Sequence, residues 1–294
     1  MINRAVIRLS LVLATLFVTL WAAPLLLAQN SDQGEGPLIN EPPKGVTPDQ
    51  VIQRFAAREK EFEQARDNYT YRQSVKVQTI DQDVPDGEYE QVVDVLFDDQ
   101  GKRIENVVYA PQNTLQRISM TKEDEDDIRR LMPFVLTSDE IPEYNISYLG
   151  QQKEDELNTY VFEVNPKKIE RAKRRFQGRI WVDDHDFQIV KTYGKAVPDF
   201  GTGGGGENVF PKFTTYREQV DGKYWFPTYT IADDYLHFKK APDVHIREIV
   251  KYTNYKRFGS RSRIIYEGQT LPTAPKNQPN SAPKPQGQEA PPPP

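Results

Sequence analysis

Hydrophobic residues between positions 47 and 66 repeat with the period of an α-helix. The apolar stripe consists of Val51, Ile52, Phe55, Phe62 and Ala65. Thr47 is a good N-cap, and Pro48 suits the first helical position, where its missing N–H costs nothing. The pattern predicts an amphipathic helix over Pro48–Arg66 that needs an apolar surface to cover.

From Tyr69 the period changes to two. In residues 69–80, tyrosines and valines alternate with polar side chains, and the same pattern returns in residues 89–97 after an Asp86-Gly87 turn. Further strands are expected at Lys102–Ala110, Tyr144–Gly150, Leu157–Asn165, Phe176–Asp183, Phe187–Lys195, Val209–Val220, Tyr224–Tyr235 and Val244–Lys256, with one more candidate at Arg263–Glu267.

The short turns between these strands indicate an antiparallel meander. About ten strands in one sheet must curl or close. One helix interrupts them: residues 121–131 start at a threonine cap, carry acids in the first turn and Arg129-Arg130 in the last, which fits the helix dipole. The predicted fold is mainly β: a strongly curved antiparallel sheet forming a half-barrel, with the two helices as a lid.

Both ends of the chain have a different composition. Residues 1–28 resemble a secretory signal, with Arg4 and Arg8 before an apolar run; the alternative is an inner-membrane anchor formed by residues 9–28. Residues 29–46 are a flexible linker by composition, residues 47–268 form the folded domain, and residues 269–294 are a disordered Pro-rich tail. Either form of the leader predicts export, and the periplasm is the expected location.

Charge and cysteine content narrow the possible functions. The net charge of −5 gives no drive toward nucleic acid, and the lack of cysteine excludes disulfides, thiolate metal sites and thiol catalysis. No nucleophile elbow, zinc-binding helix or phosphate-binding loop is present, and the three histidines lack metal-ligand spacing. We therefore expect no metal, no cofactor and no enzymatic activity, although paired carboxylates of an exported hydrolase remain an alternative.

Two groups of side chains remain as candidate sites. The stretch 167–175 carries six basic residues, of which Lys173, Arg174 and Arg175 are candidates for contact with lipid headgroups or a partner; a solvated loop is the simpler interpretation. Aromatic residues crowd the second half of the sheet, either as plain core or around an apolar cavity for an acyl chain. The cavity candidates are Phe162, Trp181, Phe213, Trp225, Tyr229 and Tyr235.

Two predicted hairpins resemble those of a known family. One runs from Phe176 through a W-V-D turn to the Q-I-V-K strand at residues 188–191, and the other ends in D-G-K-Y-W-F-P at residues 221–227. With the order of elements, they resemble the LolA-like family of outer-membrane lipoprotein-sorting carriers and their relatives. The resemblance implies a half-barrel that holds acyl chains on its concave face. Carriers of this family have a basic residue in an early strand, for which Arg72 and Arg103 are the nearest counterparts.

The resulting prediction is a non-catalytic periplasmic protein that binds or carries acyl chains of lipids or lipoproteins, with transient membrane contact. Relatives on this fold act as envelope-stress sensors, so a regulatory module that binds an envelope protein partner is the second hypothesis.

Overall fold

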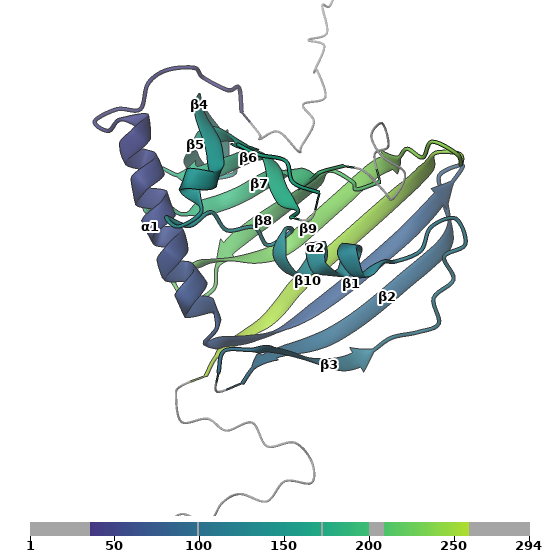
Figure 1. Ribbon diagram of the computed structural model, residues 1–294. Coiled ribbons are helices and arrows are strands. Elements are labelled where there is room, and N and C mark those ends of the chain that lie inside the picture. Colours follow the sequence, from purple (N-terminus) through teal and green to yellow (C-terminus); the bar gives the residue numbers. More distant parts are fainter. Residues whose placement is uncertain (1–35, 99, 172, 200–208, 259–294) are drawn as a thin grey trace, which may run out of the picture.

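The computed structural model describes residues 36–98, 100–171, 173–199 and 209–258, in which ten antiparallel strands form one curved sheet (Figure 1). The helices are α1 (Pro48–Arg66), α2 (Lys122–Arg130) and the 3-10 turn η2 (Ile141–Glu143). The strands are β1 (Tyr69–Asp81), β2 (Val84–Phe97), β3 (Arg103–Tyr109), β4 (Tyr144–Glu154), β5 (Leu157–Pro166), β6 (Arg175–Asp183), β7 (Ile189–Val197), β8 (Phe213–Gln219), β9 (Trp225–Leu236) and β10 (Val244–Arg257). The predicted half-barrel is confirmed: the sheet is strongly curved and its two edges remain apart.

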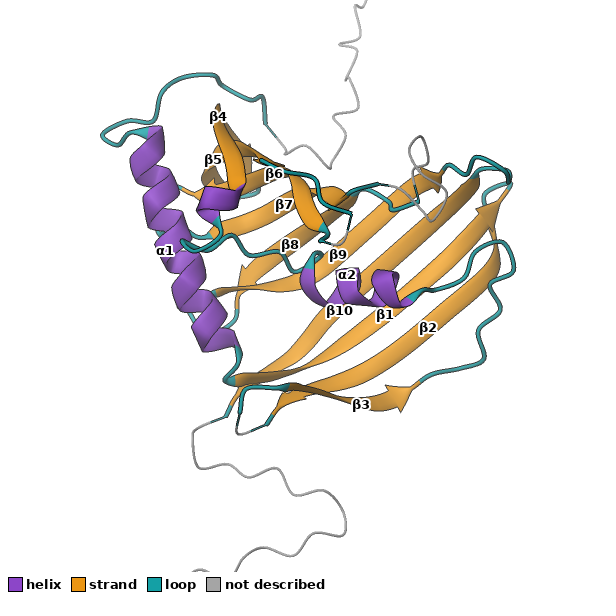
Figure 2. Cartoon of the chain, in the orientation of Figure 1, coloured by secondary structure: helices purple, strands orange, loops and turns teal. Residues whose placement is uncertain are grey.

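The order of strands is β3-β2-β1-β10-β9-β8-β7-β6-β5-β4. The expected meander therefore holds within β1–β3 and within β4–β10, but β3 and β4 lie at opposite edges. Instead, β1 pairs with β10, and Tyr69 lies opposite Arg257. Residues 110–143, which we call the crossing segment, pass over the concave side and carry α2 and η2 (Figure 2). Alternation along a strand identifies its faces but not its neighbours, so the sequence pattern did not specify this crossing.

Both helices begin where the sequence predicted, and for the predicted reason. The Thr47 hydroxyl accepts from the Gln50 amide at 3.2 Å while the Gln50 side chain accepts from the Thr47 amide at 3.0 Å. Thr121 and Asp124 form the same reciprocal cap on α2. The apolar stripe of α1 packs against the concave face of the sheet, as the contact between Phe55 and Phe162 shows, with ring centroids 5.7 Å apart.

The crossing segment fills the middle of the concave face. Met132, Phe134 and Leu136 are buried, and Phe134 stacks on Phe176 of β6 with 4.3 Å between ring centroids. The half-barrel is therefore not an empty trough. Among the described residues, two hollows lie beside this segment.

Part of the predicted linker joins the sheet. Ile39 forms a two-way backbone pair with Gln151 of β4, at 2.8 and 2.9 Å. Gly150 permits this approach, because a Cβ there would collide with the Ile39 carbonyl. The predicted signal or anchor, the Pro-rich tail and the candidate strand 263–267 lie outside the described residues. Within the described ranges, neither α-helix combines the length and apolar content that crossing a bilayer needs.

Candidate ligand-binding site

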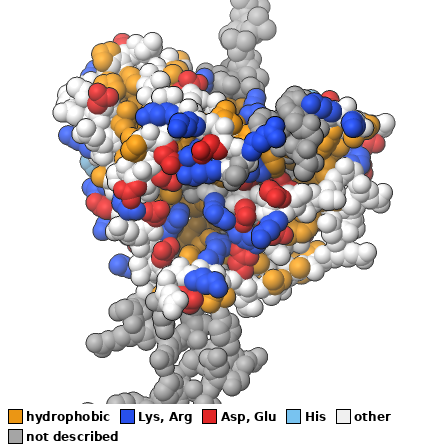
Figure 3. Space-filling model, viewed as in Figure 1, with side chains coloured by type: hydrophobic (Ala, Val, Ile, Leu, Met, Phe, Trp, Pro, Cys, Tyr) orange, Lys and Arg blue, Asp and Glu red, His pale blue; other side chains and the backbone are white. Residues whose placement is uncertain are grey.

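The concave face is hollowed on both sides of α2. Figure 3 shows an apolar floor exposed at its centre, framed by basic and acidic side chains. The two hollows have volumes of about 560 and 780 Å³, within the range of small-molecule sites. We call them the aromatic pocket and the aliphatic pocket after their walls.

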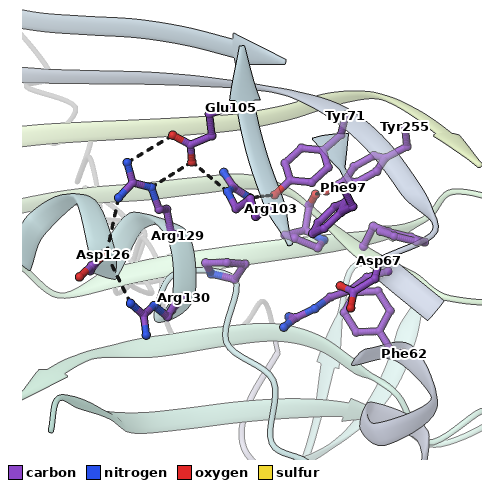
Figure 4. A pocket seen from close by; sticks show the side chains of 14 residues that line it. Phe62, Asp67, Tyr71, Phe97, Arg103, Glu105, Asp126, Arg129, Arg130 and Tyr255 are labelled. Carbon is purple, nitrogen blue, oxygen red and sulfur yellow. Dashed lines mark hydrogen bonds and ion pairs between the residues drawn. The ribbon is translucent and has the colours of Figure 1, made fainter. Parts of the chain in front are cut away.

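The aromatic pocket lies between the C-terminal end of α1, helix α2 and strands β1–β3 (Figure 4). Its walls are Phe62, Tyr71, Phe97, Pro133, Phe226, Pro227 and Tyr255, and its polar members are Arg66, Asp67, Arg103, Glu105, Asp126, Arg129 and Arg130. Tyr71 and Tyr255 stack with 5.1 Å between ring centroids, and Phe226 meets Tyr255 at 4.7 Å. The pocket thus combines a continuous aromatic wall with a guanidinium-rich rim.

One carboxylate organises this rim. Glu105 of β3 accepts hydrogen bonds from Arg103 at 2.8 Å and from Arg129 of α2 at 2.9 and 3.2 Å (Figure 4). Burial opposes ionisation of Glu105, but these two arginines outweigh it and hold its pKa below the usual value. Arg103 also donates to Tyr71 and, at 2.8 Å, to Gln73. Arg129 also pairs with Glu125 at 3.3 Å and Asp126 at 3.5 Å, so the rim is a network of arginines and carboxylates.

The aliphatic pocket lies on the other side of α2. Its apolar walls are Val77, Ile118, Met120, Pro198, Val209, Phe210, Pro211, Leu236, Phe238 and Ile246. Among its polar members, Arg174 forms an ion pair with Asp127 of α2 and lies over the Phe210 ring. Glu248 of β10 is 6% exposed, and its Oε1 atom has no hydrogen-bond partner in the described structure. This pocket therefore pairs an apolar wall with a buried acid.

The structure divides the six aromatic candidates between two faces. Phe162 and Phe213 belong to the concave core, where α1 and the crossing segment already cover them. Trp181 and Trp225 pack on the opposite face of the sheet, and their indole N–H groups donate to Gln152 at 2.9 Å and Asp186 at 2.8 Å.

The remaining two candidates also lie on that opposite face. Tyr229 lies 6.4 Å from Tyr216, and Tyr235 stacks on His245 at 4.6 Å. None of the six lines either pocket.

The basic candidates are all engaged with acids. Lys173 and Arg175 both pair with Glu143 of η2, and Arg175 is largely buried. Arg174 is the only one of the three at a pocket wall.

Arg72 lies on the face opposite the pockets and forms a bidentate pair with Asp94, at 2.8 and 3.1 Å. Arg103, the other basic residue of an early strand, lies inside the aromatic pocket. The sequence around Arg103 does not distinguish it from Arg72 as the candidate basic residue of an early strand.

Most pocket residues were not selected from the sequence. Tyr71 was visible on the apolar side of its strand, but Phe97, Arg129 and Tyr255 come together only because β1 pairs with β10 and α2 crosses the concave face. Among the described residues, no group of three His, Cys, Asp or Glu side chains is placed to bind a metal ion.

Comparisons with known proteins give structural neighbours only. No family model matches the chain, and no curated protein matches it. The chain is similar to the structure of a DUF1329 family protein from Desulfovibrio piger, with 14% identity, 71% of this chain and 92% of that chain covered, and a TM-score of 0.37. A LolA superfamily protein from Nitrosomonas europaea has 14% identity, coverage of 68% and 94%, and a TM-score of 0.31.

A third neighbour is MucB, with 13% identity, coverage of 69% and 92%, and a TM-score of 0.25; a structure of MucB with MucA(peri) also matches. The LolA superfamily is the family that the two hairpin motifs resemble.

Proposed function

We propose that this protein is an exported, non-catalytic binder or carrier of acyl-chain amphiphiles. The single observation that carries the proposal is the aromatic pocket, an apolar cavity of about 560 Å³ with an arginine-rich rim. An acyl chain would lie against Phe97, Phe226 and Tyr255, and an anionic headgroup would meet the arginines.

Burial of an acyl chain in the aromatic pocket can supply the free energy that binding requires. Burying about ten methylene groups contributes roughly 8 kcal/mol before ordering costs, which corresponds to a micromolar dissociation constant. The rim adds charge selectivity, because four arginines face three carboxylates around the pocket and a guanidinium group binds carboxylate or phosphate through two hydrogen bonds. We expect a fatty acid or the acyl chains of a lipid or lipoprotein as ligand, taken up during transient membrane contact in the periplasm.

A regulatory role with an envelope protein partner is the second proposal, and an exposed sheet edge favours it. Val107, Val108 and Tyr109 at the end of β3 are 55%, 46% and 52% exposed. A partner strand could add to this edge through backbone hydrogen bonds. At the other edge, Ile39 already pairs with β4.

Ligand capture tests the first proposal. The full chain, exported by a bacterial host and purified without detergent, should carry an acyl lipid that native mass spectrometry detects and organic extraction identifies. The purified protein should also take up a fluorescent fatty acid with micromolar affinity.

A matched pair of substitutions identifies the pocket. Phe97→Asp puts a charge into the aromatic pocket and should weaken fatty-acid binding at least about tenfold, whereas Phe238→Asp makes the same change in the aliphatic pocket and should leave it within about twofold. A protein that carries no lipid and takes up no fatty acid would contradict the proposal. Binding of a partner that Val108→Lys abolishes would then support the regulatory role.

A further inference from the structure

The aliphatic pocket contains a buried acid that has no ion-pair partner in the described structure. Glu248 projects from β10 into this pocket, is 94% buried, and leaves Oε1 without a hydrogen-bond partner. Two other buried carboxylates are paired with cations: Glu59 with Arg217 at 3.0 Å, and Glu154 with Lys191 at 2.7 Å. An unpaired carboxylate in a cavity wall is costly to retain. It therefore marks a place where a ligand group would complete the bonding.

The surroundings of Glu248 determine the sign of that group. The charged residues that act on it most strongly are Asp124 and Asp127 of α2, and both are acidic. Arg174 is directed to Asp127 rather than to Glu248. Arg117 and Arg171 also line the pocket but are not among the groups that act most strongly on Glu248. The aspartates make the potential at the ionised carboxylate negative, so a cation there is favoured and an anion is repelled.

We propose that the aliphatic pocket binds an amphiphile with an ammonium group, which forms an ion pair with Glu248 while its chain lies on Ile118, Met120, Leu236 and Phe238. The apolar wall of the pocket matches the alkyl chain of such a molecule, and the carboxyl group of Glu248 matches its ammonium group. This site is separate from the aromatic pocket, has the opposite charge preference, and does not depend on the acyl-binding proposal.

Three ten-carbon probes that differ only in their head group test the charge preference. Decylamine, decanol and decanoate are titrated into the full chain by calorimetry below their critical micelle concentrations. Decylamine should bind at least about tenfold more tightly than decanol to this site.

The titration is run at pH 8.5. The ionisable groups around Glu248 are Asp124 and Asp127 of α2, the phenol of Tyr252, and the other charged residues that line the pocket, namely Arg117, Glu123, Arg171 and Arg174. Burial, reinforced by the two aspartates, raises the pKa of Glu248 to about 8. At pH 8.5 most of the carboxyl is ionised and the alkylamine is still protonated.

Glu248→Gln keeps the shape of the side chain and removes its charge. This variant should lose the preference for decylamine over decanol, whereas Glu90→Gln on the opposite face of the sheet should keep it. Ile118→Trp should fill the pocket and weaken both probes without touching the acid. Unchanged decylamine affinity in Glu248→Gln would overturn the proposal, as would equal affinities of the wild type for decylamine and decanol.

Binding of two lysolipids then shows whether the ammonium group belongs to a lipid headgroup or to a small alkylamine. If lysophosphatidylethanolamine binds in a Glu248-dependent manner and lysophosphatidylglycerol does not, the ligand class is an aminolipid. If decylamine binds and neither lysolipid does, the class is a small alkylamine.

Discussion

At the scale of single residues, one buried arginine joins three parts of the molecule. Arg217 of β8 donates to both carboxylate oxygens of Glu59 on α1, at 3.0 and 3.1 Å, and to the carbonyl of Phe134 in the crossing segment. Both charged side chains are 1% exposed. Because both desolvated charges depend on this geometry, the pair specifies where α1 and the crossing segment meet the sheet.

Removing one member of this pair should destabilise the protein more than removing both. Arg217→Met leaves Glu59 buried without its partner and should lower the free energy of unfolding by about 3–5 kcal/mol. The double variant Glu59→Met/Arg217→Met should recover a large part of that loss. Urea denaturation of the two single variants and the double variant measures the coupling, and strictly additive losses would contradict this account.

Glu248 should make stability depend on pH. Its pKa of about 8 in the folded protein lies above the value near 4.5 of the unfolded chain, so between these values unfolding releases a proton. Stability should therefore fall by a few kcal/mol as pH rises from about 5 to 8, and level off above that range. Asp127, whose pKa burial raises to about 7 against the effect of Arg174, acts in the same direction.

Glu248→Gln removes the larger of these contributions. Relative to the wild type, the variant should gain stability steadily between pH 5.5 and 8.5 in urea denaturation. Wild-type and variant stabilities that run parallel across this range would show that the acid is ionised or solvated in the folded state.

At the scale of elements, ion pairs to two different parts of the molecule hold the C-terminal half of α2. Asp127 pairs with Arg174 of the loop before β6, and Arg129 pairs with Glu105 of β3. The helix has only nine residues, and Ile128 is its buried apolar side chain. Its position over the sheet, and thereby the width of both pockets, depends largely on these charges.

Removing one of these ion pairs of α2 should be visible as faster amide exchange. Glu105→Gln removes the charge that Arg103 and Arg129 share, so protection of residues 122–130 against hydrogen exchange should fall while that of β5–β7 stays unchanged. Glu90→Gln serves as the control with equal charge change. Unaltered protection of α2 would mean that Ile128 and the threonine cap suffice to hold it.

Elements were far easier to predict from the sequence than the site. Capping residues and the periods of 3.6 and two are local signals, and they located both α-helices and nine of the ten strands to within about four residues. The predicted Asp86-Gly87 turn is wrong: the chain turns at Gln82-Asp83, both with positive φ, and β2 already begins at Val84. The face on which an aromatic residue lies is not local. Trp181 and Trp225 lie on the convex face and Phe162 lies under α1, because either face of a curved sheet can be apolar when each has its own cover.

At the scale of the whole molecule, the crossing segment limits what the half-barrel can hold. Phe134 occupies the centre of the concave face, stacked on Phe176, and the two pockets lie on either side of its segment. Phe134→Ala should cost about 3–5 kcal/mol of stability. If the vacated volume opens toward a pocket, the variant should bind a longer fatty acid more tightly relative to a short one.

Chain-length series of fatty acids measured on both proteins check this expectation. Leu136→Ala, which truncates a neighbouring buried side chain of the same segment, is the matched control for general loosening. The same chain-length preference in all three proteins would mean that the acyl site does not extend beneath the crossing segment.

The pairing of β1 with β10 also constrains when the molecule can fold. Tyr69 of β1 pairs with Arg257 of β10, which follows it by almost the whole length of the domain. Strands β1–β3 are joined to the other seven strands of the sheet through this β1–β10 ladder. Contacts so distant along the chain form slowly and cannot form before β10 has been synthesised. Until then β1 has no partner on its β10 side, and the growing sheet exposes an open edge that can pair with other chains.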